Sequence, residues 1–526
     1  MMIILCNIYL KFNYMILANV VDNKYIKIVS CNNDEYEQLS YSFRKRIKNW
    51  RFSPLVKKKI WDGYISFFNK KNELNIGLWN ELLNVCKNFN YEIKIDGLDD
   101  FLRCDLSYDD FEKWVNEFFS DHPKFGINSD YKIRDYQIRA AYNVIKYKLS
   151  LTEIATGGGK TLIYFIVFAY LKSHGIINKM LIVVPNVSLI IQMHENFISY
   201  NNKKLQIKDA MIYADTEKEI KDANVVIGTF QSLTKQKASW FNDIDCICID
   251  EAHYTNCTSI KSIISKCNNA KIKFGMSGTL ERNEDCAEYL TLQAYIGPFV
   301  DRISADFLIN NNYISDVFIK VIHLKYKDVD INKSFYELRK RKSDKLDGAK
   351  ILSIEKQFIR DHRDRFLYIC NMIEKTTKNT LVLFNDVKYK YGREIYDYLR
   401  NNINNRKIFY IDGSVGVKLR NYYFKTMENN NNVIVVASIG TLGEGVSINN
   451  IYNIFLVEGF KSDKIIRQSI GRGVRLKEGK EKLIFIDFID DLSYGGHKNY
   501  LLKQGLERIN IYQNENFNFK IYDVDL

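Results

Sequence analysis

The stretch Ala-Thr-Gly-Gly-Gly-Lys-Thr, residues 155–161, lies between a short apolar run and a long apolar run at residues 162–171. The pattern predicts a strand, a glycine-rich turn and a helix. Glycines permit backbone conformations in which several N–H groups point at one anion, and the start of a helix adds the positive end of its dipole. Lys160 would then reach the β- and γ-phosphates of a nucleotide, and the Thr161 hydroxyl would bind Mg²⁺. A glycine-rich surface turn is the alternative, but it does not require a strand and a helix on its two sides.

A pair of carboxylates follows another apolar run. Residues 246–249 read Cys-Ile-Cys-Ile and lead directly into Asp250 and Glu251. A buried strand that ends in two carboxylates supplies the second half of a nucleoside triphosphate site, because Asp250 can hold Mg²⁺ through water and Glu251 can polarise the attacking water. Alone, the pattern also fits an acidic strand-to-loop junction. Its position after the Lys160 loop favours the catalytic interpretation.

Composition narrows the class of protein. The chain has 526 residues, 46% hydrophobic and 26% charged, which fits a globular protein of about three domains. A net charge of +13 favours nucleic acid as a partner, although a generally basic surface would give the same value. The ten cysteines form no Cys-x-x-Cys pair, so we expect reduced thiols and no zinc site. No stretch is long and apolar enough to span a bilayer, so we expect a cytoplasmic protein with no membrane partner.

Two series of short apolar runs alternate with helical patterns, one from residue 131 and the other from about residue 317. Such alternation indicates parallel sheets covered on both faces, hence an α/β fold. The pattern in residues 1–125 predicts a small α+β module. Residues 1–14 could be an extension that precedes the natural start at Met15. The patterns also predict single helices at 35–48, 351–375 and 501–512, a linker at 121–130 and a terminal strand at 517–524. The expected domains are 1–125, 126–315, 316–500 and a C-terminal helix and strand tail at 501–526.

Basic and aromatic residues alternate at residues 50–63. Lysine ammonium groups neutralise phosphates, and aromatic rings stack on bases. We therefore predict nucleic-acid contacts at Lys57, Lys58, Lys59 and Trp61. A solvated basic loop with Trp61 in a local core is the alternative.

The chain resembles superfamily 2 helicases of the DExH type from about residue 134 to residue 475. Motif I (155–161), motif II (250–253) and motif VI (468–475), in this order, are the specific part of the resemblance. The remaining motifs match at residues 134–137, 184–192 (Ia), 228–233 (Ib), 277–279 (III), 381–384 (IV) and 437–447 (V).

This resemblance implies two tandem RecA-like parallel-sheet domains, preceded by the small α+β domain, with ATP and Mg²⁺ in a cleft between them. Arg472 and Arg475 are three residues apart, so a helix would place them on one face as arginine fingers. Gln468 would act beside them, with Glu251 as the catalytic carboxylate. ATP would be bound by Gln137, Thr156, Gly157, Gly158, Gly159, Lys160 and Thr161, the metal by Thr161 and Asp250, and the nucleic-acid backbone by Thr229, Gln231, Ser438 and Gly445.

A closer resemblance covers almost the whole chain from Met15, and it is to the recombination helicases of T4-type phages. It implies a motor on branched or forked DNA and on junctions of single strands with duplex, with activity on RNA–DNA hybrids. It also implies a monomer in the host cytoplasm, with single-strand-binding or recombination proteins as partners. The alternatives are an RNA helicase, a duplex-DNA translocase, a small-molecule kinase and an ATP-gated DNA clamp. The second lobe with Arg472 and Arg475 argues against a kinase.

Overall fold

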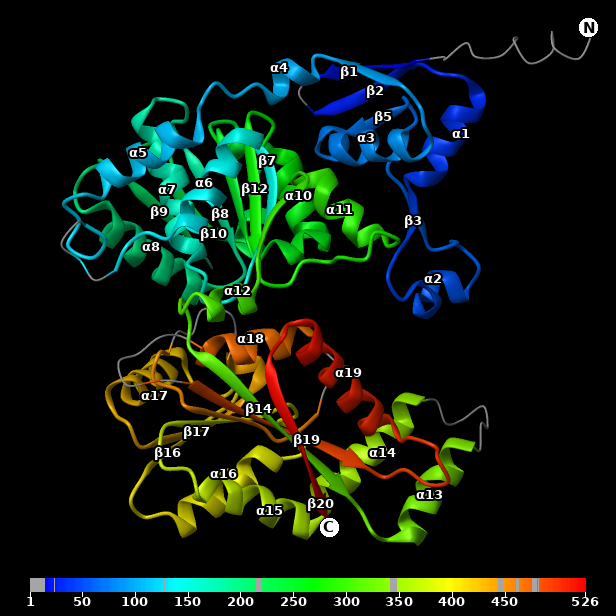
Figure 1. Cartoon of the computed structure of the whole chain (residues 1–526), viewed down its shortest axis with the longest axis vertical. Helices are drawn as coiled ribbons and strands as arrows, with labels where there is room; N and C mark the ends of the chain where they lie inside the picture. The colour runs from blue at the N-terminus through cyan, green and yellow to red at the C-terminus, as the bar shows by residue number, and fades with distance from the viewer. Residues whose placement is uncertain are drawn as a thin grey trace, which may run out of the picture. The chain divides into compact units, whose positions relative to one another are not determined.

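The structure is a computed structural model of the chain (Figure 1), and it describes residues 15–22, 24–126, 129, 131–213, 220–340, 348–442, 448–459, 463–474, 480 and 482–526. The chain divides into two compact units. One is built from the described residues of Met1–Ile154 and Gly159–Arg302, and the other from those of Ala155–Gly158 and Ile303–Leu526. In these described ranges, no helix combines the length and the apolar composition needed to cross a bilayer.

A seven-stranded sheet forms the centre of the first unit, and we call this sheet with its helices the first lobe. Its strand order is β13-β7-β12-β11-β8-β10-β9, and the strands from β7 to β9 in that order are parallel. The strands are β7 (Leu149–Ile154), β8 (Met180–Val184), β9 (Asp209–Ile212), β10 (Val225–Thr229), β11 (Cys246–Asp250), β12 (Ile272–Ser277) and β13 (Phe299–Ile303). Every residue of β7, β8, β10 and β11 is buried, which explains why β8 and the first four residues of β11 read as continuous apolar runs.

Helices cover this sheet on both sides (Figure 1). Helix α7 contacts α6 and α8, and α10 contacts α9 and α11. The helices are α6 (Asp135–Tyr147), α7 (Lys160–Ser173), α8 (Val187–Asn201), α9 (Phe230–Thr234), α10 (Thr258–Lys266) and α11 (Ala287–Tyr295), with short 3-10 turns η3 (Ala238–Phe241) and η4 (Ala252–Asn256).

The N-terminal part of the first unit is a small α+β arrangement. A four-stranded sheet has the order β5-β2-β1-β6, and β3 pairs with β4 in a separate hairpin. The elements are β1 (Ile16–Val21), β2 (Tyr25–Ser30), α1 (Asn33–Ser42), β3 (Arg44–Arg46), η1 (Trp50–Phe52), α2 (Pro54–Lys57), β4 (Tyr64–Ser66), β5 (Glu73–Asn75), η2 (Ile76–Leu78), α3 (Trp79–Asn88), β6 (Ile93–Asp96), α4 (Leu98–Leu102) and α5 (Tyr108–Phe118).

One hydrophobic core joins this N-terminal sheet to the first lobe. Leu149, Leu290 and Ala294 of the lobe belong to the same buried cluster as the inner residues of β1, β2 and α3. The two parts approach so closely at Gly77 that an added Cβ would lie 2.1 Å from the backbone oxygen of Gln293. The N-terminal part is therefore packed onto the lobe through apolar side chains that the sequence alone does not pair.

The segment expected as a linker also packs on the first lobe in its described residues. His122 is buried, and its Nε2 lies 3.0 Å from the backbone oxygen of Ser199 on α8. Just before it, Trp114 on α5 meets Tyr170 on α7 edge to face at 5.0 Å.

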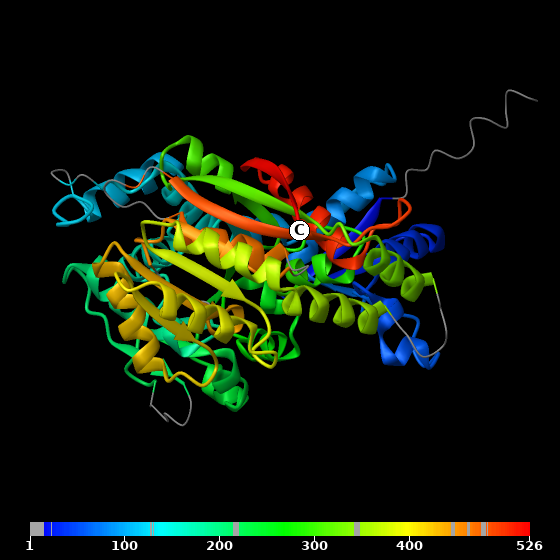
Figure 2. The same ribbon diagram turned by 90° about the horizontal axis from the view of Figure 1, so that it is seen from below.

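A second seven-stranded sheet forms the centre of the second unit, and we call this unit the second lobe. The strand order is β16-β17-β15-β18-β19-β14-β20, and every pair is parallel. Figure 2 shows β14 and β19 side by side near the C terminus. The strands are β14 (Asp316–Lys325), β15 (Thr380–Phe384), β16 (Lys407–Ile411), β17 (Val433–Ser438), β18 (Asn453–Leu456), β19 (Lys482–Asp491) and β20 (Asn518–Asp525).

The helices of the second lobe include a terminal helix that packs on β19. They are α12 (Ala305–Asn310), α13 (Val329–Lys340), α14 (Gly348–Asp361), α15 (Arg363–Glu374), α16 (Tyr391–Asn402), α17 (Val417–Asn429), η5 (Ile439–Leu442), α18 (Asp463–Gly473) and α19 (Tyr500–Asn514). The predicted fold class, two tandem RecA-like parallel-sheet domains after a small α+β region, is confirmed.

Two predicted helices were wrong in extent. The helix expected at 35–48 ends at Ser42, and the following residues form β3 because they pair with β4. The single helix expected at 351–375 is two helices, α14 and α15, separated at His362, whose backbone is extended. The break lets Arg360 donate to Glu458 at 2.6 Å and Arg365 donate to Asp490 at 2.7 Å. Two buried ion pairs thus override a continuous helical pattern.

His323 ties three strands of the second lobe together and gives a pH-dependent prediction. Its Nε2 lies 3.0 Å from Asp491 of β19, and its Nδ1 lies 2.8 Å from Asp523 of β20. The bond to Asp491 raises the pKa of His323 above its usual value, burial partly opposes this, and the bond to Asp523 adds to the rise. Burial alone would raise the pKa of Asp491, but the bonds from His323 and Ser493 lower it to about 2.

Replacing His323 with glutamine is expected to destabilise the second lobe below about pH 6.5, the ordinary pKa of histidine. A raised folded pKa means that protonated His323 stabilises the folded state at low pH, and this contribution disappears once the pH exceeds the folded pKa. We expect a loss of about 1 kcal/mol at pH 6 and a smaller loss at pH 8.5, measured by thermal unfolding. An equal loss at both pH values would contradict the charged pairing.

Candidate active site and nucleic-acid interface

The sequence motifs of the first lobe lie side by side along one edge of its sheet. Parallel strands present all their carboxyl ends at one edge of the sheet. Along that edge, neighbouring strands β7, β12, β11, β8 and β10 lead into motifs I, III, II, Ia and Ib respectively. The predicted ATP motifs therefore occupy one half of the edge, and the predicted nucleic-acid motifs occupy the other.

The glycine-rich loop joins β7 to α7 as the sequence predicts. Gly157 and Gly159 have φ values of 90° and 78°, in the region that favours glycine. An added Cβ at Gly159 would lie 2.3 Å from Nε2 of Gln137, so this glycine also makes room for a buried amide. Gln137 is held by its own helix start, where its Oε1 accepts from the backbone N–H of Arg134 at 3.1 Å. Lys160 is the first residue of α7, so the positive end of that helix faces the loop.

Lys160 joins the two carboxylates of motif II. Its Nζ donates to Oε1 of Glu251 and lies 3.8 Å from Oδ1 of Asp250. All three side chains are largely buried, with exposed fractions of 17%, 15% and 6% for Lys160, Glu251 and Asp250. The loop and the carboxylate pair, which are about 90 residues apart in the sequence, thus form one charged cluster.

A second set of contacts fixes the other oxygen of Glu251. Ser277 at the end of β12 donates its hydroxyl to Oε2 at 3.0 Å, and His253 Nδ1 lies 2.7 Å from the same hydroxyl oxygen. Burial alone would raise the pKa of the Glu251 carboxyl, but the charge of Lys160 and the bond from His253 lower it below its usual value. Glu251 is therefore ionised at neutral pH and aimed by residues of motifs I, II and III.

The backbone of Glu251 adds a second sign of function. Its φ is 52° and its ψ is 55°, a left-handed conformation that is uncommon for a residue other than glycine, asparagine or aspartate. Such strain persists when the surroundings impose it, and it occurs often at catalytic positions. Here the left-handed conformation of Glu251 turns the chain from β11 into η4, just after Asp250.

The donors near Lys160 suit a hard divalent cation. Asp250 contributes a carboxylate, Thr161 contributes a hydroxyl at the start of α7, and in this structure the ammonium of Lys160 is the cation near the carboxylates. Mg²⁺ prefers oxygen donors and keeps several waters beside one or two protein ligands. Among the described residues no cluster of three or more His, Cys, Asp or Glu side chains could hold a metal ion.

A chain of contacts leads from the N-terminal hairpin to the root of the phosphate loop. Lys48, next to β3, donates its ammonium to Glu281 at 2.9 Å, and its backbone N–H lies 2.9 Å from both carboxylate oxygens of Glu288. The next residue after Glu281 is Arg282, which donates to buried Glu153 on β7 at 3.0 Å. Glu153 lies two residues before the loop begins, so one short segment contacts both the hairpin and the strand that leads into motif I.

The hairpin itself, residues 44–66, presents cations and apolar side chains to solvent. Lys57, Lys58 and Lys59 are exposed, and so are Phe52 at 74% and Ile60 at 69%. Trp61 is half-buried, and its indole N–H donates to the backbone oxygen of Tyr64 at 2.8 Å.

The other predicted nucleic-acid residues lie at strand ends. Thr229 ends β10 and caps α9, where its Oγ1 accepts from the N–H of Ser232 at 3.4 Å, and Gln231 is exposed on that helix. Ser438 is buried at the end of β17, and its hydroxyl lies 3.0 Å from that of Thr441. Gly445 lies outside the described residues.

For motif VI, the structure describes the backbone of Gln468 and Arg472 but not their side chains. Gln468 and Arg472 lie on α18, four residues apart, but their side chains are outside the described part of the chain. Arg475 is not among the described residues either. Their predicted roles remain predictions.

Two further residues enter the site: Tyr164, which the sequence did not mark, and Ser277, which it marked only as part of motif III. Tyr164 donates its hydroxyl to Oδ1 of Asp250 at 2.9 Å, and burial together with the charge of Asp250 raises the pKa of this phenol well above its usual range. Its position four residues after Lys160 on α7 places both side chains on one helix face, a spacing that could have identified it. Ser277 belongs to motif III, and only the adjacency of β11 and β12 shows that it contacts Glu251.

Comparison with known families gives three matches along the chain. Residues 130–282 match the family described as type III restriction enzyme, res subunit, and residues 364–477 match the helicase conserved C-terminal domain. Residues 16–96 match the N-terminal part of DNA helicase UvsW.

Individual relatives and solved structures are similar to large parts of this chain. The ATP-dependent DNA helicase uvsW of Enterobacteria phage T4 is 29% identical over 514 residues, covering 95% of this chain and 97% of that protein. A crystal structure of T4 UvsW, 27% identical, covers 97% of this chain and 99% of that one with a TM-score of 0.48. The DNA-bound type ISP restriction-modification enzyme LlaBIII, 18% identical, covers 75% of this chain and 32% of that one with a TM-score of 0.53, a likeness of fold alone. With its motifs in this order and these matches, the chain resembles the superfamily 2 helicases and is an ATP-dependent helicase similar to UvsW.

Proposed function

We propose that the protein is an ATP-dependent DNA helicase that remodels branched DNA. It would regress forks, migrate Holliday junctions and unwind D-loops and R-loops. The proposal rests on the properties of the N-terminal part. It matches a DNA helicase, it exposes a basic and apolar hairpin, and it contacts the segment after motif III through Lys48.

In this proposal Glu251 polarises the water that attacks the γ-phosphate. Its carboxylate is ionised, and Ser277 and Lys160 each hold one of its oxygens. When ATP binds, the ammonium of Lys160 moves to the phosphates and frees Oε1 of Glu251 for the water. Asp250 and Thr161 would hold Mg²⁺, which would neutralise charge on the phosphates. Gln137 recognises the adenine, and residues 156–159 contribute backbone N–H groups.

We further propose that the second lobe completes the ATP site with Arg472 and Arg475 as arginine fingers and Gln468 beside them. Such a finger stabilises charge that develops in the transition state and contributes about 10³–10⁵-fold in rate in related NTPases. ATP would then close the two lobes and hydrolysis would release them. The domain limits 1–125, 126–315, 316–500 and 501–526 belong to the same proposal.

The nucleic-acid strand would follow the motif Ia and Ib half of the first lobe and the end of β17. Thr229, Gln231, Ser438 and Gly445 are small or polar residues, which suit contacts to phosphates that ignore sequence. The hairpin would engage the branch, with Lys57, Lys58 and Lys59 on phosphates. Because Trp61 uses its N–H inside the hairpin, we assign base contact to Phe52 as well, which is exposed on the same hairpin.

The test is ATP hydrolysis and unwinding measured at one salt concentration with single-stranded, duplex, forked and four-way DNA, RNA–DNA hybrid and duplex RNA. We expect the largest stimulation and unwinding with forked and four-way DNA. Preference for RNA would favour the RNA helicase alternative. Movement on duplex without strand separation would favour a translocase, and absence of stimulated turnover would favour an ATP-gated clamp.

Replacing Lys57 and Lys58 together with alanine is expected to weaken binding of forked DNA. Each lysine that contacts a phosphate contributes about one unit to the slope of log affinity against log salt, so the slope should fall by about two. Fluorescence anisotropy across a salt series measures this. The matched control replaces Lys70 and Lys71, exposed on the β4–β5 connection, and an equal effect of both pairs would indicate nonspecific charge.

A further inference from the structure

A cavity of about 1080 Å³ lies in the first unit, where the N-terminal sheet packs on the first lobe, and we call it the junction cavity. Its lining includes Leu149 and Ile272, the first residues of β7 and β12, so it lies at the amino edge of the lobe sheet. The ATP motifs lie at the opposite edge. The six residues of β7 separate the two edges by roughly 16–20 Å, at about 3.3 Å per residue.

Three half-buried lysines from separate elements line this cavity. Lys24 precedes β2, Lys148 follows α6 and Lys273 lies on β12. Lys24 donates its ammonium to Oδ1 of Asn268 at 3.2 Å, and Lys148 donates to the backbone oxygen of Phe101 at 2.7 Å. These two bonds bridge the N-terminal part and the lobe. Within the described chain, none of the three ammonium groups has a carboxylate partner.

Lys273 is the most enclosed of the three. Burial lowers the pKa of its ammonium below the usual value, the thiol of Cys267 opposes this, and the charge of Lys24 lowers the pKa further. The ammonium groups of Lys24 and Lys273 repel each other beside the junction cavity, and an anion bound between them would stabilise both.

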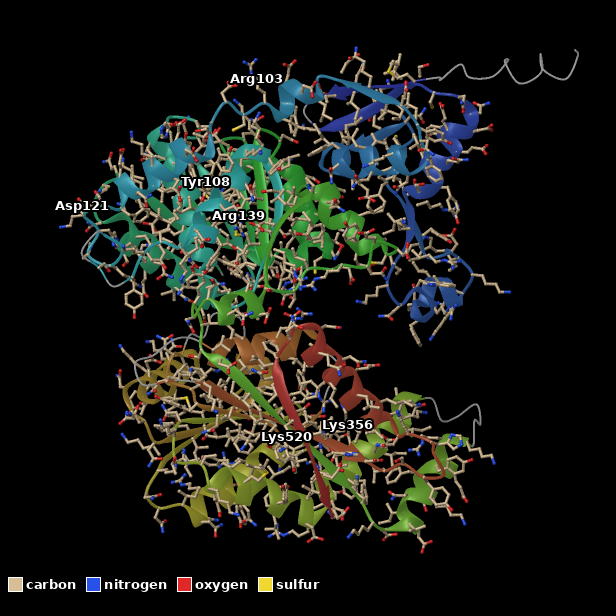
Figure 3. The ribbon with its side chains drawn as sticks, viewed as in Figure 1. Arg103, Tyr108, Asp121, Arg139, Lys356 and Lys520 are labelled. Atoms are coloured by element: carbon tan, nitrogen blue, oxygen red, sulfur yellow. The ribbon has the colours of Figure 1, made fainter. Side chains whose placement is uncertain are left out.

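The acidic side chains of the lining do not neutralise these lysines. Asp22, Asp100 and Asp105 are exposed, and Asp105 pairs with Arg103, which is labelled in Figure 3, at 3.2 Å. Asp245 is occupied by two backbone N–H groups, those of residues 178 and 179, at 2.7 and 3.1 Å. The acidic residues of the lining are therefore either exposed or already hydrogen-bonded to the backbone, whereas these three lysines are half-buried.

The lining also contains aromatic and aliphatic side chains, beside polar ones such as Asn75, Ser265 and Asn269. Tyr25 comes from β2, Phe101 from α4 and Tyr170 from α7, where it stacks on His174 with ring centroids 4.1 Å apart. Small-molecule sites commonly combine such apolar walls with a few polar groups in a volume of about 300–1,000 Å³. The junction cavity reaches the upper end of that range, enough for a compound of mononucleotide size.

We propose that the junction cavity is a second ligand site, separate from the ATP site, for a planar aromatic phosphate of about mononucleotide size. Lys24 and Lys273 hold the phosphate, and the ring lies against Tyr25, Phe101 or Tyr170. Lysine ammonium groups bind phosphate as point charges, and a dianion matches two of them. Because its walls come from both the N-terminal part and the lobe, a ligand there strengthens the junction between them. The proposal does not depend on which nucleic acid the helicase unwinds.

The test uses pyridoxal 5′-phosphate on the full-length protein, with pyridoxal as the matched probe without phosphate. With this probe Lys24 holds the phosphate, and the neutral Nζ of Lys273 beside it attacks the aldehyde carbon while water leaves, which forms an imine. Added borohydride then transfers hydride to the imine carbon and a proton from solvent completes a stable secondary amine. Peptide mass spectrometry assigns each labelled lysine, so labelling of Lys160 at the ATP site is counted separately.

We expect labelling of Lys273 to need at least a tenfold lower concentration of pyridoxal 5′-phosphate than of pyridoxal. The concentration of pyridoxal 5′-phosphate that labels Lys273 should also be lower than the concentration that labels exposed Lys27. Lys24→Met should remove that preference for the phosphate-bearing probe, and Lys27→Met should keep it, with unchanged unfolding midpoints in both variants. Equal labelling by the two probes would identify a merely reactive lysine and overturn the site. Labelling of Lys273 no faster than that of Lys27 would overturn it as well.

Discussion

Replacing Glu251 with glutamine is expected to lower ATP hydrolysis stimulated by forked DNA by about 10³-fold while ATP binding is kept. The amide has the size of the carboxylate, so the contacts to Ser277 and Lys160 can persist in altered form. What is lost is the negative charge that polarises the attacking water. The measurement is steady-state ATP hydrolysis together with equilibrium binding of a fluorescent ATP analogue.

The matched control is Glu284→Gln, the same chemical change at an exposed position of the first lobe. It should leave both quantities unchanged. The Glu251 variant should also stay bound to DNA in the presence of ATP, because nucleotide is held but not turned over. Normal hydrolysis by this variant would mean that another residue activates the water.

Replacing Lys160 with alanine is expected to lower hydrolysis by about 10²–10³-fold and, unlike the change at Glu251, to weaken ATP binding as well. The ammonium is the cation that compensates Asp250 and Glu251 in this structure, and it is placed to contact the phosphates. Its removal leaves two close carboxylates without a counter-charge. The pKa of Glu251 should therefore rise, because the charge of Lys160 is a principal cause of its lowered value.

The expected rise in the pKa of Glu251 distinguishes the loss of the Lys160 contact from general unfolding of the variant. Residual hydrolysis by the Lys160 variant should decline at a higher pH on the acid side than hydrolysis by the unmodified protein. Lys172→Ala, near the opposite end of α7, is the control and should change neither affinity nor the pH profile. Retained ATP affinity in the Lys160 variant would contradict the assignment of the phosphate-binding lysine.

The N-terminal part shows how tertiary contacts change the design of an experiment. From the sequence, residues 1–125 look like a module that could be deleted to test DNA binding. The shared core that includes Leu149, Leu290 and Ala294 means that deletion would expose apolar surface of the first lobe and remove the contact of Lys48 with Glu281. Point changes on the exposed hairpin therefore test DNA binding more cleanly than truncation does.

The sequence by itself determined the fold class and the chemistry of the ATP motifs. Buried parallel strands read as continuous apolar runs, and the loop at residues 155–161 needs glycines and a lysine because phosphates impose that requirement locally. Even the ends of β7, β8 and β15 follow from the apolar pattern, since burial changes sharply there.

Only the tertiary structure decided which distant residues meet. Lys160, Glu251 and Ser277 form one cluster because β7, β12 and β11 are neighbours in the sheet, an order that no local pattern encodes. The same reason applies to the break at His362, where Arg360 and Arg365 on its two sides pair with the distant buried acids Glu458 and Asp490, and to the junction cavity, whose lysines come from three separate elements. Local sequence fixes what each segment can form, whereas long-range packing fixes which side chains share an environment.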